Sequence, residues 1–275
     1  MKNIQWFPGH MTKSMRQISE SAKLIDGVIC VVDARAPFSC INKKLGEIFL
    51  NKPIIFALNK SDLVERADLN KMLFKFKEQG FIATPVIATD KKSTLNCLNI
   101  LKGELKEKVE RNALKGKPIR VSVIGIPNTG KGTFINSLCG QKKAITGDKA
   151  GVTRSTQWVK INGVELLDTP GTMPPSFDSQ ELARKLAYIG SINDDILDKE
   201  EICLELIKEL MQICPEKLNE KYKIQCQDKE GLAVYEEICK KRGFLLRGGD
   251  YDYTRCANAV IDDFRKGRIG KICLE

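Results

Sequence analysis

Two short motifs in this chain have the residue types and spacing of a nucleotide-binding site. Asn59-Lys60-Ser61-Asp62 follows the pattern Asn-Lys-x-Asp, whose polar side chains match the edge of a guanine ring. Residues 125–132 follow the pattern Gly-x-x-x-x-Gly-Lys, a loop whose backbone N–H groups can surround a phosphate. An ordinary GTPase has the phosphate loop first and the guanine motif last. The order here is reversed, so the sequence predicts a circularly permuted GTPase.

The guanine motif predicts selectivity for GTP over ATP. Asn59 and Asp62 would hydrogen-bond the base, with the Asp62 carboxylate accepting from the ring N–H and the exocyclic amine, which adenine does not offer in that arrangement. Lys60 would pack beneath the base. We also expect Ala88 and Thr89, at the end of a strand predicted over 82–88, to contact the nucleotide.

The phosphate side of the predicted site combines the glycine-rich loop with a second acidic motif. Lys131 would bridge the β- and γ-phosphate oxygens at the N-terminus of a helix. Asp168-Thr169-Pro170-Gly171 fits the pattern Asp-x-x-Gly, in which we expect Asp168 to hold Mg²⁺ through a water and Gly171 to offer its N–H to the γ-phosphate. The phosphate-loop residues expected to bind nucleotide are Asn128, Thr129, Gly130, Lys131, Gly132 and Thr133.

The elements that must position these motifs are buried strands alternating with helices. Short apolar runs at 28–33, 53–58, 82–88 and 119–124 are typical of parallel strands, and a hairpin is predicted from 156–161 and 164–167. This alternation predicts an α/β fold with a doubly wound, mostly parallel sheet, whose ligand loops lie at the carboxyl ends of the strands. Helices alone are predicted after Pro174-Pro175, over 179–192, 195–213, 230–242 and 252–268. We therefore expect a GTPase domain over residues 1–175 and an all-helical domain over 176–275.

Composition narrows the class of protein. The chain has 275 residues, and none of its apolar runs approaches the ~20 residues that a membrane span needs. We therefore expect a cytoplasmic protein with no membrane partner. We also expect it to be a monomer. Its ten cysteines form no C-x-x-C pair and it has one histidine, which favours reduced core thiols over a metal site. Residues 1–175 carry 28 Lys and Arg against 15 Asp and Glu, or +13, and the rest carry 17 against 20, or −3. That excess fits either a solvated lysine-rich surface or a polyanionic partner such as RNA.

Several segments together resemble the ribosome biogenesis GTPase A family of circularly permuted GTPases. They are the opening Trp6-Phe7-Pro8-Gly9-His10-Met11, the segment Asp33-Ala34-Arg35-Ala36-Pro37, the permuted motifs and the helical tail. The resemblance covers essentially the whole chain. It implies a GTP- and GDP-binding enzyme, with Mg²⁺ as cofactor, that acts in late maturation of the large ribosomal subunit. It also implies that the C-terminal helices contact rRNA of the precursor particle.

One residue departs from the family pattern at the metal. Gly132 stands where Ser or Thr supplies a hydroxyl to Mg²⁺, and Thr133 is no obvious replacement because that position addresses the α-phosphate. Thr153 is the expected second protein ligand of the metal. We favour a weakened but working GTPase, and the alternative is a hydrolysis-impaired, GTP-binding RNA assembly factor. The Asn-Lys-x-Asp motif argues against a small-molecule kinase.

The residue that would orient the attacking water is also unusual. Thr172 follows Gly171 where a Ras-like GTPase has Gln, and the resemblance offers His10 as the catalytic or water-positioning group instead. The other interpretation of His10 is a structural histidine in a packed N-terminal turn. Asn128 could hold a K⁺ ion near the phosphates, as in related GTPases. We expect hydrolysis to be slow in the free protein and stimulated by the ribosomal particle.

Overall fold

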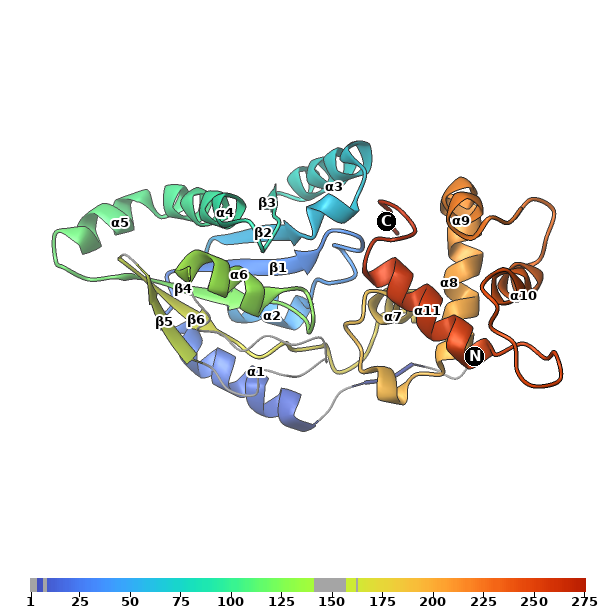
Figure 1. Ribbon diagram of the computed structural model, residues 1–275. Coiled ribbons are helices and arrows are strands. Elements are labelled where there is room, and N and C mark those ends of the chain that lie inside the picture. Colours follow the sequence, from blue (N-terminus) through green and yellow to red (C-terminus); the bar gives the residue numbers. More distant parts are fainter. Residues whose placement is uncertain (1–3, 7–8, 141–156, 162) are drawn as a thin grey trace.

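The computed structural model describes residues 4–6, 9–140, 157–161 and 163–275, with the backbone alone at His10. The molecule is elongated, with a sheet flanked by helices at one end and a group of helices at the other (Figure 1). Six strands form one sheet in the order β3-β2-β1-β4-β6-β5, parallel except for the antiparallel pair β5 and β6. The strands are β1 (Gly27–Asp33), β2 (Ile54–Asn59), β3 (Ile82–Pro85), β4 (Ile119–Ile124), β5 (Gln157–Ile161) and β6 (Val164–Asp168).

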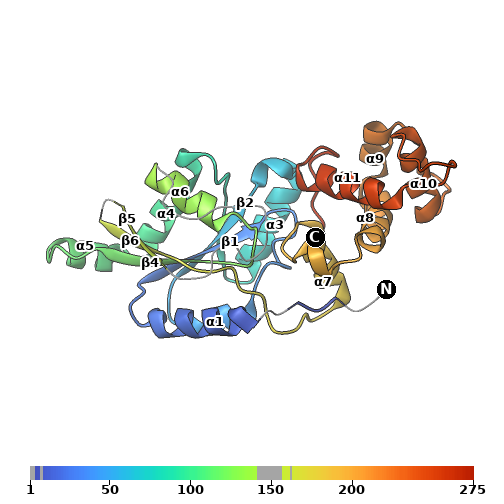
Figure 2. The ribbon, with the colours of Figure 1, turned by 60° about the horizontal axis from the view of Figure 1, so that its bottom comes forward.

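The sheet is covered on both faces because its central strand is apolar at every interior position. Side chains of β1 alternate between two cores, with Val28, Cys30 and Val32 in one and Ile29 and Val31 in the other. The first core faces α1 (Gly9–Ala22), α2 (Lys43–Ile48) and α3 (Arg66–Glu78). The second faces α4 (Lys91–Glu104), α5 (Lys106–Ala113) and α6 (Lys131–Cys139). Figure 2 shows α1 and α6 on opposite faces, which confirms the doubly wound arrangement predicted from the sequence.

The remaining helices follow the sheet in the chain. They are α7 (Gln180–Tyr188), α8 (Lys199–Ile213), α9 (Pro215–Tyr222), α10 (Gly231–Lys241) and α11 (Tyr253–Arg265), and we call residues 176–275 the helical region. Its described backbone has no strand apart from one isolated bridge between Leu245 and Tyr251. The first core of the sheet continues into α8 and α11 without a break, so the division at residue 175 stays a prediction.

The local differences from the sequence prediction have simple causes. Strand β3 ends at Pro85, earlier than predicted, and the two helices that follow it, α4 and α5, meet at Leu105. Helix α9 lies between the helices predicted over 195–213 and 230–242, and its first residue is Pro215. Proline is in fact well suited to the first turn of a helix, where its missing N–H is not needed.

The chain end returns to the sheet. Ile272 N–H donates to Leu63 O at 2.9 Å, and Leu274 N–H donates to Arg35 O at 2.8 Å. The Glu275 carboxylate accepts from the N–H groups of Phe38 and Ser39 at 2.7 and 2.8 Å. No helix among the described residues is long and apolar enough to cross a membrane.

Candidate nucleotide-binding site

Asn59 joins three of the segments that the sequence predicts at the nucleotide. It is the last residue of β2 and is 2% exposed. Its Nδ2 donates to Thr129 O of the phosphate loop at 2.7 Å, and its Oδ1 accepts from Ala88 N–H at 2.8 Å. The guanine motif, the loop after β3 and the phosphate loop are therefore fastened together at one edge of the sheet, where parallel strands end.

Lys60 lies between the guanine motif and the phosphate loop. Its backbone is left-handed, with φ of 58°, which turns the chain into the short 3₁₀ helix Ser61–Leu63 that carries the exposed Asp62. Lys60 Nζ donates to Asn128 O at 3.2 Å and pairs with the Asp33 carboxylate at 2.8 Å. The charged end of Lys60 thus bridges the phosphate loop and the loop after β1.

The phosphate loop requires glycine where other segments approach its backbone. Gly130 has φ of 96°, and a Cβ there would lie 2.2 Å from Asn59 Nδ2. Thr129 Oγ1 and Lys131 Nζ both donate to Ile126 O, at 3.1 and 2.7 Å, and hold the loop closed on itself. Burial lowers the pKa of Lys131 to about 8, although the nearby charge of Asp168 opposes the shift.

Helix α6 begins at Lys131, directly after the loop, so the N–H groups of its first turn point toward the place predicted for phosphate. Gly132 and Thr133 lie in this turn and are half-buried. Thr89 is exposed beside the buried Ala88. The nucleotide contacts of these residues remain predictions.

The Asp-x-x-Gly motif lies against the phosphate loop. Asp168 ends β6 beside Val123 of β4, is 2% exposed, and has its pKa raised by burial to about 6, with the charge of Lys131 acting in the other direction. A Cβ on Gly171 would lie 2.7 Å from Pro127 Cα, so glycine permits this contact. Thr172 N–H donates to Gly125 O at 3.3 Å, which holds the motif onto the start of the loop.

Two predicted residues cannot be placed in the site. Thr153 and the side chain of His10 lie outside the described residues. The backbone of His10 is in the first turn of α1, and its neighbour Met11 is fully buried. Met173 N–H lies 3.4 Å from Met11 Sδ, so the start of α1 contacts the segment that follows Gly171.

The structure also shows contacts at the site that were not predicted from the sequence. Asp33 is fully buried and is bound by both Arg35 and Lys60 at 2.8 Å. Burial alone would raise the pKa of Asp33, but the two cations outweigh it and hold that pKa well below its usual range. Asn128 Nδ2 donates to Gly190 O of the helical region at 2.7 Å. The one available signal was the position of Asp33 at the carboxyl end of a buried strand.

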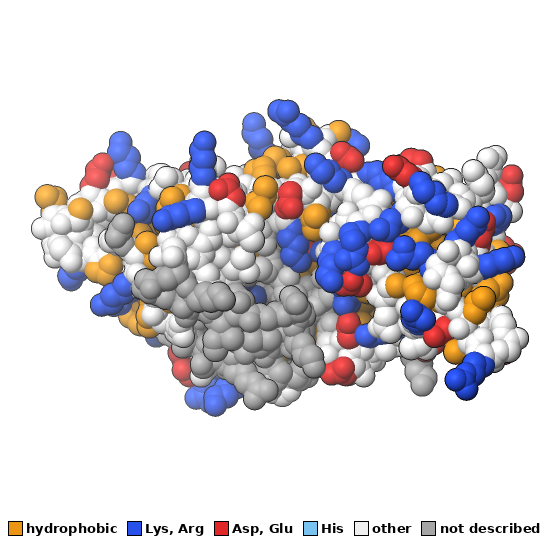
Figure 3. Space-filling view, viewed as in Figure 1, with side chains coloured by type: hydrophobic (Ala, Val, Ile, Leu, Met, Phe, Trp, Pro, Cys, Tyr) orange, Lys and Arg blue, Asp and Glu red, His pale blue; other side chains and the backbone are white. Residues whose placement is uncertain are grey.

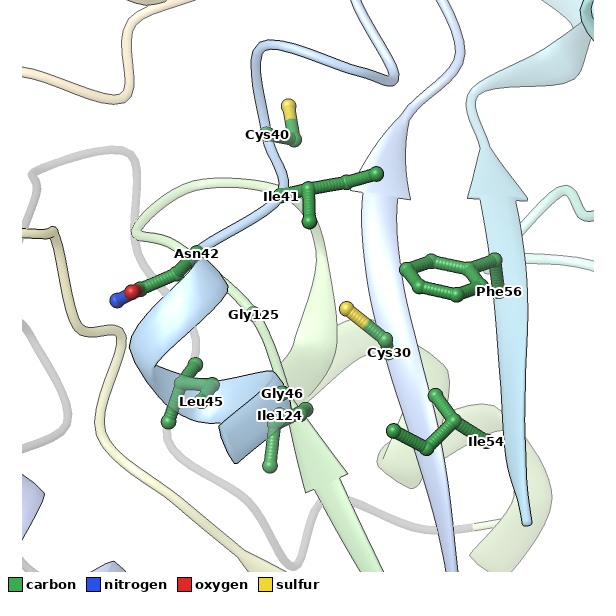
Figure 4. Close-up of a pocket in the computed structure, with 10 residues that line it drawn as sticks. All are labelled: Cys30, Cys40, Ile41, Asn42, Leu45, Gly46, Ile54, Phe56, Ile124 and Gly125. Carbon is green, nitrogen blue, oxygen red and sulfur yellow. The ribbon is translucent and has the colours of Figure 1, made fainter. Parts of the chain in front are cut away.

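A small apolar cavity lies on the α2 side of the sheet, where Gly125 at the start of the phosphate loop forms part of its lining. Its volume is about 30 Å³, close to the space for one water molecule, so it cannot hold a nucleotide. Figure 4 shows it between the sheet and α2, with the thiol of Cys30 and the side chains of Ile54, Phe56 and Leu45 around it. Among the described residues, no group of His, Cys, Asp or Glu is arranged to hold a metal by itself.

Comparison with known proteins identifies the family. The family described as 50S ribosome-binding GTPase matches residues 120–237. Ribosome biogenesis GTPase A of Priestia megaterium is 40% identical over 272 residues, which cover 97% of this chain and 94% of that protein. This chain belongs to the ribosome biogenesis GTPase A family. The Thermotoga maritima member is 31% identical over 273 residues, covering 99% of this chain and 94% of that one.

The solved structures agree with this assignment. GNP-bound YlqF from T. maritima has a TM-score of 0.68 and 26% identity, covering 96% of this chain and 97% of that chain. The GDP-bound YlqF structure gives a TM-score of 0.69 with 26% identity, over 94% and 98% of the two chains. The prediction of a circularly permuted GTPase that hydrolyses GTP in ribosome biogenesis is thereby confirmed. Membership of this GTPase family also implies the usual dependence on Mg²⁺.

Proposed function

We propose that this chain is a GTPase switch that acts in the cytoplasm, late in maturation of the large ribosomal subunit, and couples its nucleotide state to binding of the precursor particle and its rRNA. The observation that carries the nucleotide part is the pair of Asn59 hydrogen bonds to Thr129 O and from Ala88 N–H. They bring the permuted motifs to one edge of the sheet. The relatives' names and the 50S ribosome-binding description support the ribosomal part.

The roles of the site residues follow from their positions. Asp62, exposed in its turn, reads the guanine edge, with Lys60 beneath the base and Asn59, Ala88 and Thr89 around it. Residues 128–133 surround the phosphates, because this loop enters a helix N-terminus. Gly171 lies against Pro127 of the loop, and we assign its N–H to the γ-phosphate.

The residues present fit Mg²⁺ with one ligand fewer than usual. Asp168 is a buried carboxylate beside the phosphate-loop strand, and burial destabilises its charge unless a cation is near. Asp168 would hold the metal through water, and Thr153 would be a direct ligand. Gly132 has no hydroxyl to contribute. When bound, Mg²⁺ neutralises developing charge on the transferred phosphoryl group.

His10 is the group we assign to positioning the attacking water. Thr172, which stands at the position of the Ras-like Gln, is fully buried, and its hydroxyl has no hydrogen-bond partner among the described residues. It therefore does not face an open phosphate site. The contact of Met11 with Met173 places the start of α1 at the segment that follows Gly171 and supports His10 as the alternative. K⁺ bound at Asn128 would supply further positive charge.

An rRNA partner agrees with the charge of the chain, +10 in total. Figure 3 shows Lys and Arg side chains spread over both ends of this face of the molecule, with Asp and Glu interspersed over the helical region. We assign particle binding to the basic GTPase half together with the helical region. Binding should therefore weaken as salt concentration rises.

The test is GTP turnover by the wild type and by His10→Ala, each with and without purified large ribosomal subunits. We expect His10→Ala to keep its GTP affinity within about twofold, since the group acts in the transition state, and to lose most of the stimulated rate. Thr12→Ala is the matched control, an exposed neighbour in the same helix, and should behave as wild type. Equal stimulation of all three proteins would exclude His10. Absence of stimulation in the wild type would refute the coupling to the particle.

A further inference from the structure

Arg35 is a buried cation that touches both the sheet and the helical region. It is 1% exposed. Its Nε and Nη2 donate to the two oxygens of Asp33 at 2.9 and 2.8 Å, a bidentate pair. Its Nη1 donates to Phe264 O and Arg265 O, both at 3.1 Å, and the guanidinium lies 5.1 Å from the Phe264 ring centroid. The last carbonyls of α11 carry the negative end of the helix dipole, so they suit a cation.

The Asp33 carboxylate connects Arg35 to Lys60 of the guanine motif. Lys60 Nζ lies 2.8 Å from the same carboxylate and 3.2 Å from Asn128 O. A fully buried carboxylate is stable as an ion only while its cations stay in place. The position of Lys60 therefore depends on the ion pair between Arg35 and Asp33.

A second contact runs from the helical region to the phosphate loop. Asn128 Nδ2 donates to Gly190 O, in the turn after α7. The Arg265 guanidinium fixes that turn by donating to Tyr188 O and Ala187 O at 3.1 and 2.8 Å, and it also pairs with Asp194 at 2.7 Å. Since Arg265 O is an acceptor of Arg35, the two contacts share one residue. The end of α11 is thus connected to the guanine motif through Arg35 and Asp33, and to the phosphate loop through the turn after α7.

We propose that Arg35 is a positioning residue for guanine-nucleotide binding: through Asp33 it holds Lys60 in place, and its bonds to α11 make nucleotide affinity depend on docking of the helical region. The proposal rests on the role given above to Lys60. Coupling of this kind is reciprocal, so bound nucleotide must also stabilise the docked position of α11. In Arg35 variants the carboxylate has Lys60 as its remaining cation, and the lysine is drawn away from the base.

The test measures GDP and GTP affinity of the wild type, Arg35→Met, Lys60→Met and the double variant. We expect Arg35→Met to weaken both nucleotides alike, by about tenfold, because the effect acts on the base and not on the γ-phosphate. In the Lys60→Met background the same change should cost less than about twofold, because the residue it positions is gone. Lys71→Met is the matched control, since Lys71 pairs with Asp68 at 3.0 Å within α3 and that pair does not join the helical region to the sheet. It should leave affinity unchanged.

Arg35→Lys keeps the charge but cannot make the bidentate pair and both carbonyl bonds at once, so it tests the geometry in a milder variant. We expect it to fall between wild type and Arg35→Met. Hydrogen exchange of the amides in the last turn of α11 should slow on GDP binding in the wild type and not in Arg35→Lys. Unchanged GDP affinity in Arg35→Lys, or effects of Arg35 and Lys60 that simply add, would overturn the proposal. Failure of the wild type to bind GDP at all would instead refute the nucleotide site itself.

Discussion

Replacing Asn59 with Ala should separate the three loops of the nucleotide site. The side chain is 2% exposed and makes two short bonds, 2.7 Å to Thr129 O and 2.8 Å from Ala88 N–H. Removing it leaves one buried donor and one buried acceptor unpaired, and each such group costs about 1–3 kcal/mol. Partial entry of water would reduce the sum. We therefore expect the free energy of unfolding to fall by about 2–4 kcal/mol, a large share of the ~5–15 kcal/mol typical of a protein.

Urea unfolding followed by circular dichroism, with and without excess GDP, measures this loss. GDP affinity should fall as well, so GDP should stabilise the variant less than the wild type. Asn59→Asp keeps the acceptor for Ala88 N–H but places an oxygen against Thr129 O, and it should recover no more than half of the loss. Asn112→Ala is the control, because the Asn112 side chain donates to Pro118 O at 3.3 Å, away from the site. A decrease below about 1 kcal/mol for Asn59→Ala, with GDP affinity intact, would refute this account of the site.

Three further outcomes test other parts of the chain. Gly132→Ser should raise Mg²⁺-dependent GTP affinity and turnover by about tenfold, because its hydroxyl would contact the metal directly. Gly132→Ala should only stabilise α6, by about 0.5–1 kcal/mol. Equal effects of the two variants in a GTP-binding titration would place the metal elsewhere. Asp62→Asn should shift preference from GTP toward XTP in competition binding, since the carboxylate pairs with donors that guanine has, and an unaltered preference would contradict its assignment. At pH 8 a thiol reagent should label Cys139 first, because the other nine cysteines are buried. Burial also raises the pKa of the Cys30 thiol to about 12. Rapid reaction of several thiols in the native protein would contradict the packing.

Much of the site could be predicted from the sequence because its motifs follow strands. A run such as 53–58 is apolar enough to be a buried parallel strand, and parallel strands bring their carboxyl ends to one edge. The meeting of Asn59 with the phosphate loop follows from that rule. The sheet order also agrees with the permuted arrangement, since the break in the chain leaves every strand neighbour in place.

The contacts with the helical region could not be predicted in this way. Asn128 and Gly190 are 62 residues apart, and Arg35 and Phe264 are 229 apart. Both contacts are made to backbone carbonyls, which every residue has, so no pattern of side-chain types reveals the partner. The acceptors are selected by where α7 and α11 end and by tertiary packing, neither of which has a periodic signal.

The permuted order has a further consequence for how hydrolysis could do mechanical work. Gly171 and the first residue of α7, Gln180, are separated only by residues 172–179, a tether of at most about 28 Å. Its first two residues, Thr172 and Met173, are fully buried. In this permuted chain the segment leads directly from the end of β6 into α7 of the helical region. A displacement of Gly171 when the γ-phosphate leaves would therefore be passed to α7 through the covalent backbone of this short segment.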